Sequence, residues 1–324
     1  MALTTYIEAI REAMQEEMRR DPSVLLLGED VGTYGGAFRA SAGFLDEFGD
    51  ERVIDTPISE SGIVGVAVGC AMNGMKPIAE MQFIDFLSNG FNQVVNMAAK
   101  ARYRWNAGVP LVIRGPCGGG VHGGPFHSQN VESHYLSTPG LKIVEPATAY
   151  DAKGLLKSAI RDPDPVLFFE HKFLYRRIKE DLPEGDWVVP IGKAAVRREG
   201  HDLSVITFGA CVHHALEAAD ALDAEGVSME VVDLRTLLPL DRSALHQTAK
   251  KTSRVIVYHE AQRTGGIGAE ISAILAEECF EWLDAPVVRV TAPDSPVPYS
   301  PPLEAAFLPG PPALLAAARR LVAY

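Results

Sequence analysis

An acidic residue follows a short predicted strand at the start of a helix that is packed with small residues. The strand is VID at 53–55, Glu60 ends the segment DTPISE, and the helix continues as SGIVGVAVGCAMNG. A carboxylate at a helix N-terminus complements the helix dipole, and that alone would explain Glu60. The small residues favour a second function, because they allow close packing against a large group and would leave the carboxyl poorly hydrated. Such a carboxyl can share a proton with a ring nitrogen.

Other side chains follow predicted strands in the same way. Glu29 and Asp30 follow the strand at 24–27, and Gln82 follows the strand at 77–81, with Phe86 four residues later. Ligands of open parallel sheets bind at the carboxyl ends of the strands. Gln82 and Phe86 are therefore candidates to face a ring-shaped ligand, although the phenylalanines of this region could also all belong to the core.

A glycine-rich stretch, RGPCGGGVHGGPFHSQ (114–129), contains two histidines. It could be a plain surface loop or a phosphate cradle, but it lacks GxxxxGK[ST] and no helix follows at once. We favour a mobile loop that brings a histidine to a site. His127 is the best candidate, because it lies between the glycines and Ser128-Gln129 and histidine exchanges protons near neutral pH.

A second glycine motif, GGIGAE (265–270), lies between a predicted strand and a predicted helix. A dinucleotide site would need GxGxxG spacing in an opening βαβ unit, and this motif has neither. A tight strand-to-helix turn is the favoured interpretation.

Apolar runs of strand length alternate with helical patterns along the first part of the chain. Thr5 and Glu8 form a capping-box pattern before an amphipathic helix that ends at Asp21-Pro22. The strands expected after it are 24–27, 53–55, 77–81, 110–114, 141–146 and 165–170. The helices expected between them are at about 62–73, 85–104 and 151–160. This order predicts βαβ units and a parallel sheet covered on both faces.

A polar segment rich in Pro and Gly, residues 180–192, is typical of a linker. We therefore expect two domains, at 1–185 and 186–324. The second repeats the α/β order, with strands at 203–209, 229–234, 254–260 and 286–292 and helices at about 211–224, 241–250, 267–283 and 313–322. The Pro-rich stretch 292–307 is expected to be an ordered loop. The predicted fold class is α/β, with two parallel-sheet domains.

Composition excludes several classes of protein. The 324 residues include 30 Lys and Arg against 42 Asp and Glu, a net charge of −12, which argues against a nucleic-acid binder. The four cysteines lie far apart with no CxxC, which argues against a zinc ribbon or a disulfide framework. The apolar runs are too short to span a membrane, and the first residues lack the apolar core of a signal peptide. We expect a soluble, cytoplasmic protein.

Several segments, taken in order, resemble those of one protein family. They are LGEDVGTYGGAF (27–38), RVIDTPISESGIVGVAVG (52–69), AEMQFIDF (79–86), FHSQN (126–130), GLKIVEPATAYDAKGLL (140–156), VVDLRTLLPLD (231–241) and HEAQRTGGIGAEIS (259–272). From about Thr5 to its C-terminus the chain resembles the β chain of the thiamine-diphosphate-dependent decarboxylating component of 2-oxo acid dehydrogenase complexes. The resemblance implies a transketolase-like architecture, with a pyrimidine-binding domain followed by a transketolase C-terminal domain.

The resemblance also implies roles for individual residues. Glu60 would hydrogen-bond the aminopyrimidine ring of thiamine diphosphate and favour the imino tautomer that activates the cofactor for decarboxylation. His127 would donate a proton as the acyl group passes to a lipoyl group on an acyltransferase core. The residues implied to line the cofactor are Glu29, Ile58, Ser59, Glu60, Gln82 and Phe86. Those implied to contact the substrate are Phe86, Asn89, His127, Ser128 and Gln129.

One motif of thiamine enzymes is missing from the sequence. The GDG motif that holds the diphosphate and Mg²⁺ does not occur in this chain. The resemblance therefore implies that an α chain supplies that half of the site and holds most of the Mg²⁺ ligands, in a heterotetramer of two α and two β chains. Some family members also hold K⁺ through backbone carbonyls. The matching positions here are Leu111, Ala159, Ile160, Asp162 and Asp164.

The substrate is left open among 2-oxo acids. FFEHKFLYRR (168–177) and residues 259–280 are closer to branched-chain members, whereas FIDFLSNGF (83–91) lacks a Tyr and a Pro that are usual there. Branched-chain 2-oxo acids are favoured over pyruvate, with acetoin third. Two readings from other classes are a non-catalytic docking scaffold and a nicotinamide-dependent oxidoreductase built on GGIGAE. Retention of Glu60, Gln82 and His127 argues against the scaffold.

Overall fold

The computed structural model describes residues 3–324, which group into two compact units. The first unit comprises the chain up to Cys117 together with Tyr135–Ile191. The second comprises Gly118–His134 and Gly192–Tyr324. The glycine-rich loop is thus inserted in the chain of the first unit but makes its contacts with the second. The boundary expected at 185/186 lies shortly before the end of the first unit.

The first unit is built on a parallel sheet. Its strands are β2 (Val24–Gly28), β3 (Val53–Asp55), β4 (Lys76–Glu80), β5 (Val112–Cys117), β6 (Lys142–Val144) and β7 (Val166–His171). They lie in the order β6-β7-β5-β4-β2-β3, and every neighbouring pair in that order is parallel. The carboxyl ends of these strands therefore meet at one edge, as the sequence predicts. A short antiparallel pair, β1 (Thr4–Thr5) with β8 (Lys179–Glu180), completes the strands of this unit.

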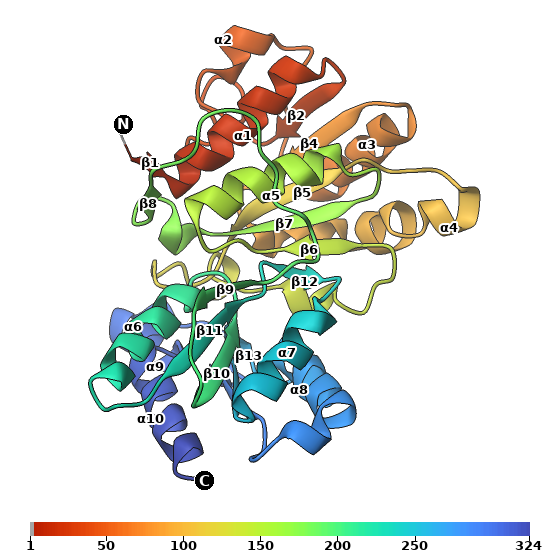
Figure 1. The fold of residues 1–324 in the computed structure, drawn as a ribbon. Helices are drawn as coiled ribbons and strands as arrows, with labels where there is room; N and C mark the ends of the chain where they lie inside the picture. Colours follow the sequence, from red (N-terminus) through yellow and green to blue (C-terminus); the bar gives the residue numbers. More distant parts are fainter. Residues whose placement is uncertain (1–2) are drawn as a thin grey trace. The chain divides into compact units, whose positions relative to one another are not determined.

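Two helices of the first unit lie side by side, α1 (Tyr6–Arg20) and α5 (Ala149–Arg161) (Figure 1). The capping box predicted from the sequence starts α1: Thr5 Oγ1 accepts from Glu8 N, and Glu8 returns a bond to Thr5 N. The buried face of α1 includes Ile10, Met14 and Met18, at the helical spacing predicted.

The helix expected at 85–104 is broken into pieces, and the prediction of one continuous helix is wrong. The pieces are the 3₁₀-helix η1 (Ile84–Gly90), the π-helix η2 (Gln93–Ala98) and α4 (Ala101–Trp105). Both η1 and η2 pack on α3 (Glu60–Met72). Gly90 allows the close approach, because a Cβ there would lie 2.9 Å from Val64 Cγ2. The regular helix is interrupted where glycine allows the chain to pack closely against α3.

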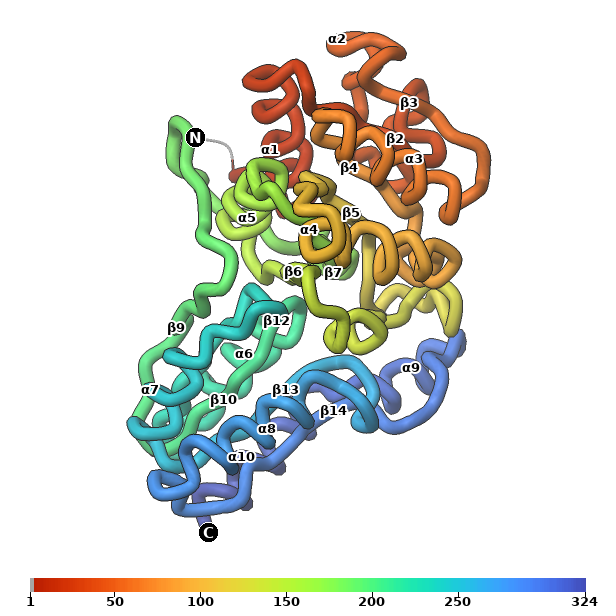
Figure 2. Tube along the Cα trace, turned by 90° about the vertical axis from the view of Figure 1, so that its right-hand side faces the viewer, coloured from red at the N-terminus to blue at the C-terminus, as the bar shows by residue number. Residues whose placement is uncertain are grey.

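The second unit has its own sheet and two layers of helices. The strands are β9 (Ala195–Arg198), β10 (Leu203–Thr207), β11 (Met229–Asp233), β13 (Val255–Gln262) and β14 (Val288–Ala292). They lie in the order β14-β13-β10-β11-β9, parallel except for the antiparallel edge strand β9. The helices α6 (Cys211–Asp223) and α10 (Pro311–Val322) cover one face, and α7 (Arg242–Thr252) and α8 (Ile267–Glu278) cover the other (Figure 1). Figure 2 shows β13 and β14, which are parallel neighbours in this sheet.

One more expectation about this unit is wrong. The Pro-rich stretch contains a helix, α9 (Pro301–Phe307). Proline is tolerated in the first turn, where the missing N–H has no intrahelical partner, so Pro301 and Pro302 begin the helix instead of preventing it. The remaining short elements are α2 (Phe44–Phe48), η3 (Gly124–Phe126), η4 (Glu132–His134), η5 (Lys172–Leu174), β12 (Thr236–Leu238) and η6 (Phe280–Trp282).

The helices of residues 3–324 include none that combines the length and the apolar character needed to cross a bilayer.

A charged side chain lies at the centre of the first unit. Arg114, on β5, is 1% exposed and pairs with Glu80 on β4 and with Glu170 on β7. The guanidinium is bidentate to Glu170, with Nε–Oε1 at 2.5 Å and Nη2–Oε2 at 2.6 Å. The Tyr175 hydroxyl also donates to Glu170, at 2.7 Å. Burial raises the pKa of Glu80 despite Arg114, and it holds the pKa of Tyr175 well above its usual range.

We expect Arg114→Met to destabilise the protein by about 3–5 kcal/mol, because it leaves two carboxylates buried without a cation. The matched control is Arg19→Met, which breaks a solvent-exposed pair with Glu47 and should destabilise the protein far less than Arg114→Met. Urea unfolding of both variants measures the difference. If both variants lose the same free energy of unfolding, the predicted stabilising role of the buried ion pairs is wrong.

Candidate functional site

Glu60 is the first residue of α3 and is reached from β3 through an exposed segment. Ser59 occupies the N-cap position but makes no side-chain hydrogen bond to the helix. The Glu60 side chain is half-buried, and its Oε2 accepts from Asn89 Nδ2 at 3.1 Å. Nearby in sequence, Ile58 is 83% exposed, unusual for so large an apolar side chain. The chain by itself therefore orients Glu60 but does not enclose it, unlike the poorly hydrated pocket expected from the sequence.

A second carboxyl lies close enough to Glu60 to feel its charge. Glu29, at the end of β2, is 6% exposed, and burial raises its pKa, with further contributions from Glu60 and Asp30. Asp30 accepts from Gln82 Nε2 at 3.1 Å. The strand ends thus bring Glu29, Glu60 and Gln82 into one group, as the sequence predicts. Asp30 joins the group, and its φ of 57° marks the turn that places it there.

Phe86 is positioned by a chain of aromatic rings. Its ring packs edge-on against Phe83, which packs edge-on against Phe38, with ring centroids 6.2 and 5.6 Å apart. Phe38 in turn packs against Tyr175, at 5.2 Å. Edge-to-face contacts of this kind fix ring orientation. Packing against Phe83 therefore fixes the ring of Phe86, which lies between Gln82 and Asn89 in the sequence.

The other predicted substrate residues lie in the second unit, on the segment 118–134, which we call the His127 loop. His127 follows the 3₁₀ turn η3 and is half-buried. Ser128 is fully buried, and the carbonyl of Gln129 accepts from Gly118 N at 3.0 Å. The loop is thus closed at its base. The His127 loop and the Glu60 group belong to different units.

Three carboxylates of the second unit hold the His127 loop or lie against it, and sequence reasoning missed all of them. Glu260, on β13, accepts from Gly119 N at 2.6 Å and from Asn130 Nδ2 at 2.9 Å. Glu304, on α9, accepts from backbone N–H groups at the other end of the glycine run. Glu132 lies within the loop and is 1% exposed. An acid within a Pro-rich stretch, such as Glu304, or within a strand, such as Glu260, gives no signal of its own in one sequence.

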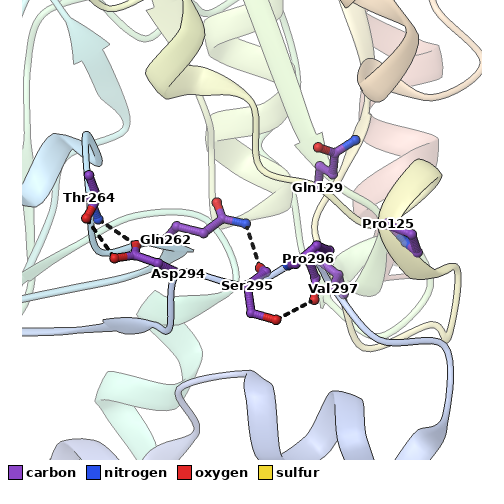
Figure 3. A pocket seen from close by; sticks show the side chains of 8 residues that line it. All are labelled: Pro125, Gln129, Gln262, Thr264, Asp294, Ser295, Pro296 and Val297. Atoms are coloured by element: carbon purple, nitrogen blue, oxygen red, sulfur yellow. Dashed lines mark hydrogen bonds between the residues drawn. The ribbon is translucent and has the colours of Figure 1, made fainter.

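A pocket of about 550 Å³ opens beside the His127 loop (Figure 3). Gln129 and Pro125 line it from the loop. On the other side Gln262 Nε2 donates to Ser295 O at 3.4 Å, and the Asp294 carboxylate accepts from Thr264 N and Oγ1 at 2.9 and 2.7 Å. The two bonds from Thr264 fix its hydroxyl group and lower the pKa of Asp294. The pocket is therefore walled by fixed polar groups.

The motif GGIGAE forms the turn between β13 and α8. Gly268 N donates to Nε2 of His259 at 3.3 Å, and a Cβ on Gly266 or Gly268 would lie 2.7 Å from the imidazole. Burial lowers the pKa of His259 to about 4, so the ring is neutral near pH 7. The glycines make room for this imidazole, which favours the tight-turn interpretation over a dinucleotide site.

The five positions matched to a K⁺ site lie around the start of β5 and the end of α5. Leu111 O accepts from Val166 N at 2.9 Å, and Ala159 O accepts from Asp162 N at 3.2 Å. The Asp162 carboxylate is paired with Lys142 at 2.6 Å, and that of Asp164 with Arg102 at 2.5 Å. Within residues 3–324 there is no cluster of His, Cys, Asp and Glu that could hold a metal ion. A K⁺ site made of carbonyls stays a prediction.

Comparison with known proteins identifies the family. The pyrimidine-binding domain of transketolase matches residues 3–177, and the transketolase C-terminal domain matches residues 192–314. The chain is 54% identical, over 327 residues, to the 2-oxoisovalerate dehydrogenase subunit beta of Bacillus subtilis (strain 168), with both chains fully covered. It belongs to the β-subunit family of the 2-oxo acid dehydrogenases.

Other relatives agree with this family. The chain is 46% identical over 328 residues to the pyruvate dehydrogenase E1 component subunit beta of Bacillus subtilis (strain 168), again with full coverage of both. It is 45% identical over 302 residues to the same subunit of Staphylococcus epidermidis, covering 93% of each chain. A solved structure named as a split gene transketolase, inactive beta4 tetramer, aligns with a TM-score of 0.80 and 24% identity over 99% of each chain. At that identity the structure supports the fold alone. The family resemblance and the α/β, transketolase-like fold predicted from the sequence are confirmed.

The buried Glu132 gives this β-subunit family member a pH-dependent stability. Burial, with a smaller contribution from Glu260, raises the pKa of Glu132 from 4.5 to about 7. Below pH 4.5 the carboxyl is protonated in both the folded and the unfolded chain, so its burial costs nothing. Between 4.5 and 7 only the unfolded chain ionises, so stability falls; above about 7 the loss is constant.

We therefore expect Glu132→Gln to reduce the loss of stability between pH 5 and pH 8, by on the order of 3 kcal/mol at most. Thermal melts of the wild type and the variant at pH 5 and pH 8 measure the change in stability of each protein. Subtracting one change from the other removes the contribution of the other titrating groups, which both proteins share. Glu184→Gln, at an exposed position, is the control and should follow the wild type. Parallel curves for wild type and Glu132→Gln would contradict the assignment.

Proposed function

We propose that this chain is the β subunit of a branched-chain 2-oxo acid dehydrogenase, which decarboxylates its substrate on thiamine diphosphate and passes the acyl group to a lipoyl group of an acyltransferase core. The observation that carries the proposal is the carboxyl group of Glu60 at the start of α3, oriented by Asn89 and close to the buried Glu29. The 54% identity to a 2-oxoisovalerate dehydrogenase subunit supports the choice of substrate.

The residues present fit the aminopyrimidine of thiamine diphosphate. Burial and the neighbouring charge of Glu60 raise the pKa of Glu29, so a proton-bearing ring is a suitable partner for this pair of carboxyl groups. The exposed Ile58 offers an apolar contact, and Phe86 offers a ring held in place by its neighbours. When bound, thiamine diphosphate supplies a carbon nucleophile and an electron sink.

In this proposal the chain's own residues bind the ring and move two protons, one in each step. Glu60 exchanges a proton with the ring nitrogen, while Asn89 keeps the carboxyl in place. Gln82 and Ser59 bind polar atoms of the ring, and Ile58 excludes water from it. His127 donates a proton in the acyl step, with Ser128 and Gln129 beside the substrate. A histidine suits that role because its unperturbed pKa lies near neutrality.

A partner chain must complete the site. The sequence has no GDG motif, so we assign the diphosphate and most of the Mg²⁺ ligands to an α subunit, in an assembly of two α and two β chains. The surface of the first unit supports a partner, because α3 and the segments packed on it leave large apolar side chains exposed. These are Val66, Met72, Phe91 and Met97. We also place K⁺ at the carbonyls named above, and the protein in the cytoplasm, consistent with its four free cysteines.

Pyruvate is the second candidate substrate, favoured by the 46% identity to a pyruvate dehydrogenase subunit, and acetoin is the third. A docking scaffold without catalysis would have no need of the oriented Glu60, so we rank it below the enzyme.

The substrate is tested by turnover of the α–β complex with an artificial electron acceptor, thiamine diphosphate and Mg²⁺. We expect kcat/KM for 3-methyl-2-oxobutanoate to exceed that for pyruvate by at least tenfold, about 1.4 kcal/mol of transition-state discrimination. Preference for pyruvate would keep the reaction and change the substrate. No turnover with either acid by an intact complex would favour acetoin or the scaffold.

The role of Glu60 is tested by Glu60→Gln in the same assay. We expect turnover to fall by about 10²–10⁴-fold, the usual contribution of a positioned acid or base, because the amide cannot exchange the proton. Glu184→Gln, on the exposed surface, should leave turnover unchanged. Wild-type turnover by Glu60→Gln would remove Glu60 from the mechanism.

A further inference from the structure

The His127 loop has a regular backbone pattern that gathers N–H groups. Gly118, Gly120, His122 and Gly124 have φ values of 82°, 77°, 60° and 66°, whereas Gly123 between them has φ −80°. Alternation of left-handed and right-handed residues turns successive N–H groups toward one side, which makes a concave site for an anion. A non-glycine residue, His122, accepts this strained conformation.

The anion in this concavity is the side chain of Glu304. Its Oε1 accepts from Gly120 N at 3.0 Å, and its Oε2 accepts from His122 N at 3.2 Å. The His122 ring adds a third contact, Nδ1 to Oε2 at 2.6 Å. Glu304 is only 1% exposed, so its charge depends on these donors. Charge-assisted bonds of this kind are about twice as strong as neutral ones.

Neighbours of Glu304 in sequence complete the hold on the loop. A Cβ on Gly119 would lie 3.0 Å from Leu308 Cδ2, and one on Gly124 would lie 2.3 Å from the Tyr299 ring. Glu260 ties together the two ends of the loop through Gly119 and Asn130. The loop expected to be mobile is therefore anchored at its ends and in its middle.

The turn that Glu304 binds also contacts His127. Gly123 follows the residues bound by Glu304, and a Cβ on it would lie 2.9 Å from His127 Cβ and 2.8 Å from Ser128 Oγ. His127 N also donates to Gly124 O at 3.4 Å. The turn that Glu304 fixes is thus the surface on which His127 and Ser128 rest.

We propose that Glu304 is a positioning residue for the acyl step: its carboxylate fixes the backbone of the His127 loop and so sets where the imidazole can deliver a proton. The proposal rests on the proposed role of His127. It assigns Glu304 to the transfer of the acyl group and not to decarboxylation, which depends on Glu60. A displacement of about 1 Å in a reacting group can cost about 10²-fold in rate.

The test separates the two half-reactions in the assembled α–β complex. Decarboxylation is followed with an artificial electron acceptor, and acyl transfer is followed with a free lipoyl domain of the acyltransferase as substrate. For Glu304→Ala we expect acyl transfer to fall by about 10- to 100-fold while decarboxylation changes by less than about threefold. Glu304→Gln keeps the volume and one acceptor oxygen, so it should recover part of the rate, and it provides the test if Glu304→Ala fails to assemble.

Two further variants identify the cause of the result. Glu230→Gln alters another buried acid of the same unit, bound to Ser204, Thr248 and Lys251, and should lower stability without separating the two rates. His127→Asn should lower acyl transfer at least as much as Glu304→Ala. If His127→Asn leaves acyl transfer unchanged, the proposed role of His127 is wrong.

If His127→Asn slows acyl transfer, the Glu304 variants decide the proposal. Equal loss of both rates, or loss of neither, overturns the positioning role of Glu304. A selective loss in Glu304→Ala that Glu304→Gln partly restores, with no such split in Glu230→Gln, supports it.

Discussion

The site edge of the first unit depends on one buried guanidinium. Arg114 joins β5 to both neighbouring strands, through Glu80 and Glu170, close to where those strands end. Glu80 is also register partner to Gly28, the last residue of β2, which directly precedes Glu29. The turn after β2 returns to the same carboxylate, because a Cβ on Gly36 would lie 2.6 Å from Glu80 Oε1. The position of Glu29 therefore depends on the ion pair between Arg114 and Glu80, which joins β4, the neighbour of β2, to β5.

Buried carboxylates recur in this protein, and they differ in how their charge is compensated. Glu80 and Glu170 share a guanidinium, whereas Glu304 uses backbone N–H groups and a histidine. Compensation of either kind makes a carboxylate a structural anchor. The pair Glu29 and Glu60 is different, because burial and the charge of Glu60 raise the pKa of Glu29, and the side chain that donates to Glu60 is a neutral amide, that of Asn89. An incompletely compensated pair at a strand edge is the place where a ligand has most to contribute.

The sequence predicted most of the regular elements, because their signals are local. The capping box at Thr5 and Glu8, and the periodic apolar face after it, determine α1 without reference to the rest of the chain. The helix expected at 85–104 failed because its form is set by contact with α3, a tertiary effect that helix periodicity does not contain. The helix α9 lies in a stretch whose high Pro content predicts an ordered loop, but Pro301 and Pro302 stand in the first turn, where proline is compatible with a helix.

The candidate site was predictable to the extent that strand ends and family motifs mark it. Glu29, Glu60 and Gln82 all follow strands, and parallel strands end at one edge, so their meeting follows from topology. Glu260 and Glu304 could not be found in this way, because they lie 141 and 184 residues along the chain from the glycines that they bind. A glycine-rich sequence indicates only that a backbone can take unusual φ values. It does not indicate which anion the resulting N–H groups enclose.

The Glu304 carboxylate explains why the His127 loop needs its glycines. A run such as GGGVHGG is flexible in the unfolded chain, and each glycine loses more conformational entropy on folding than another residue would. The loop can nevertheless be rigid where its N–H groups converge on a buried carboxylate, because each lost bond would leave a charge unsolvated. The glycines are then required for their left-handed geometry at 118, 120 and 124, and not for motion. A histidine that must meet a reacting group at a defined distance is better served by such a loop than by a flexible one.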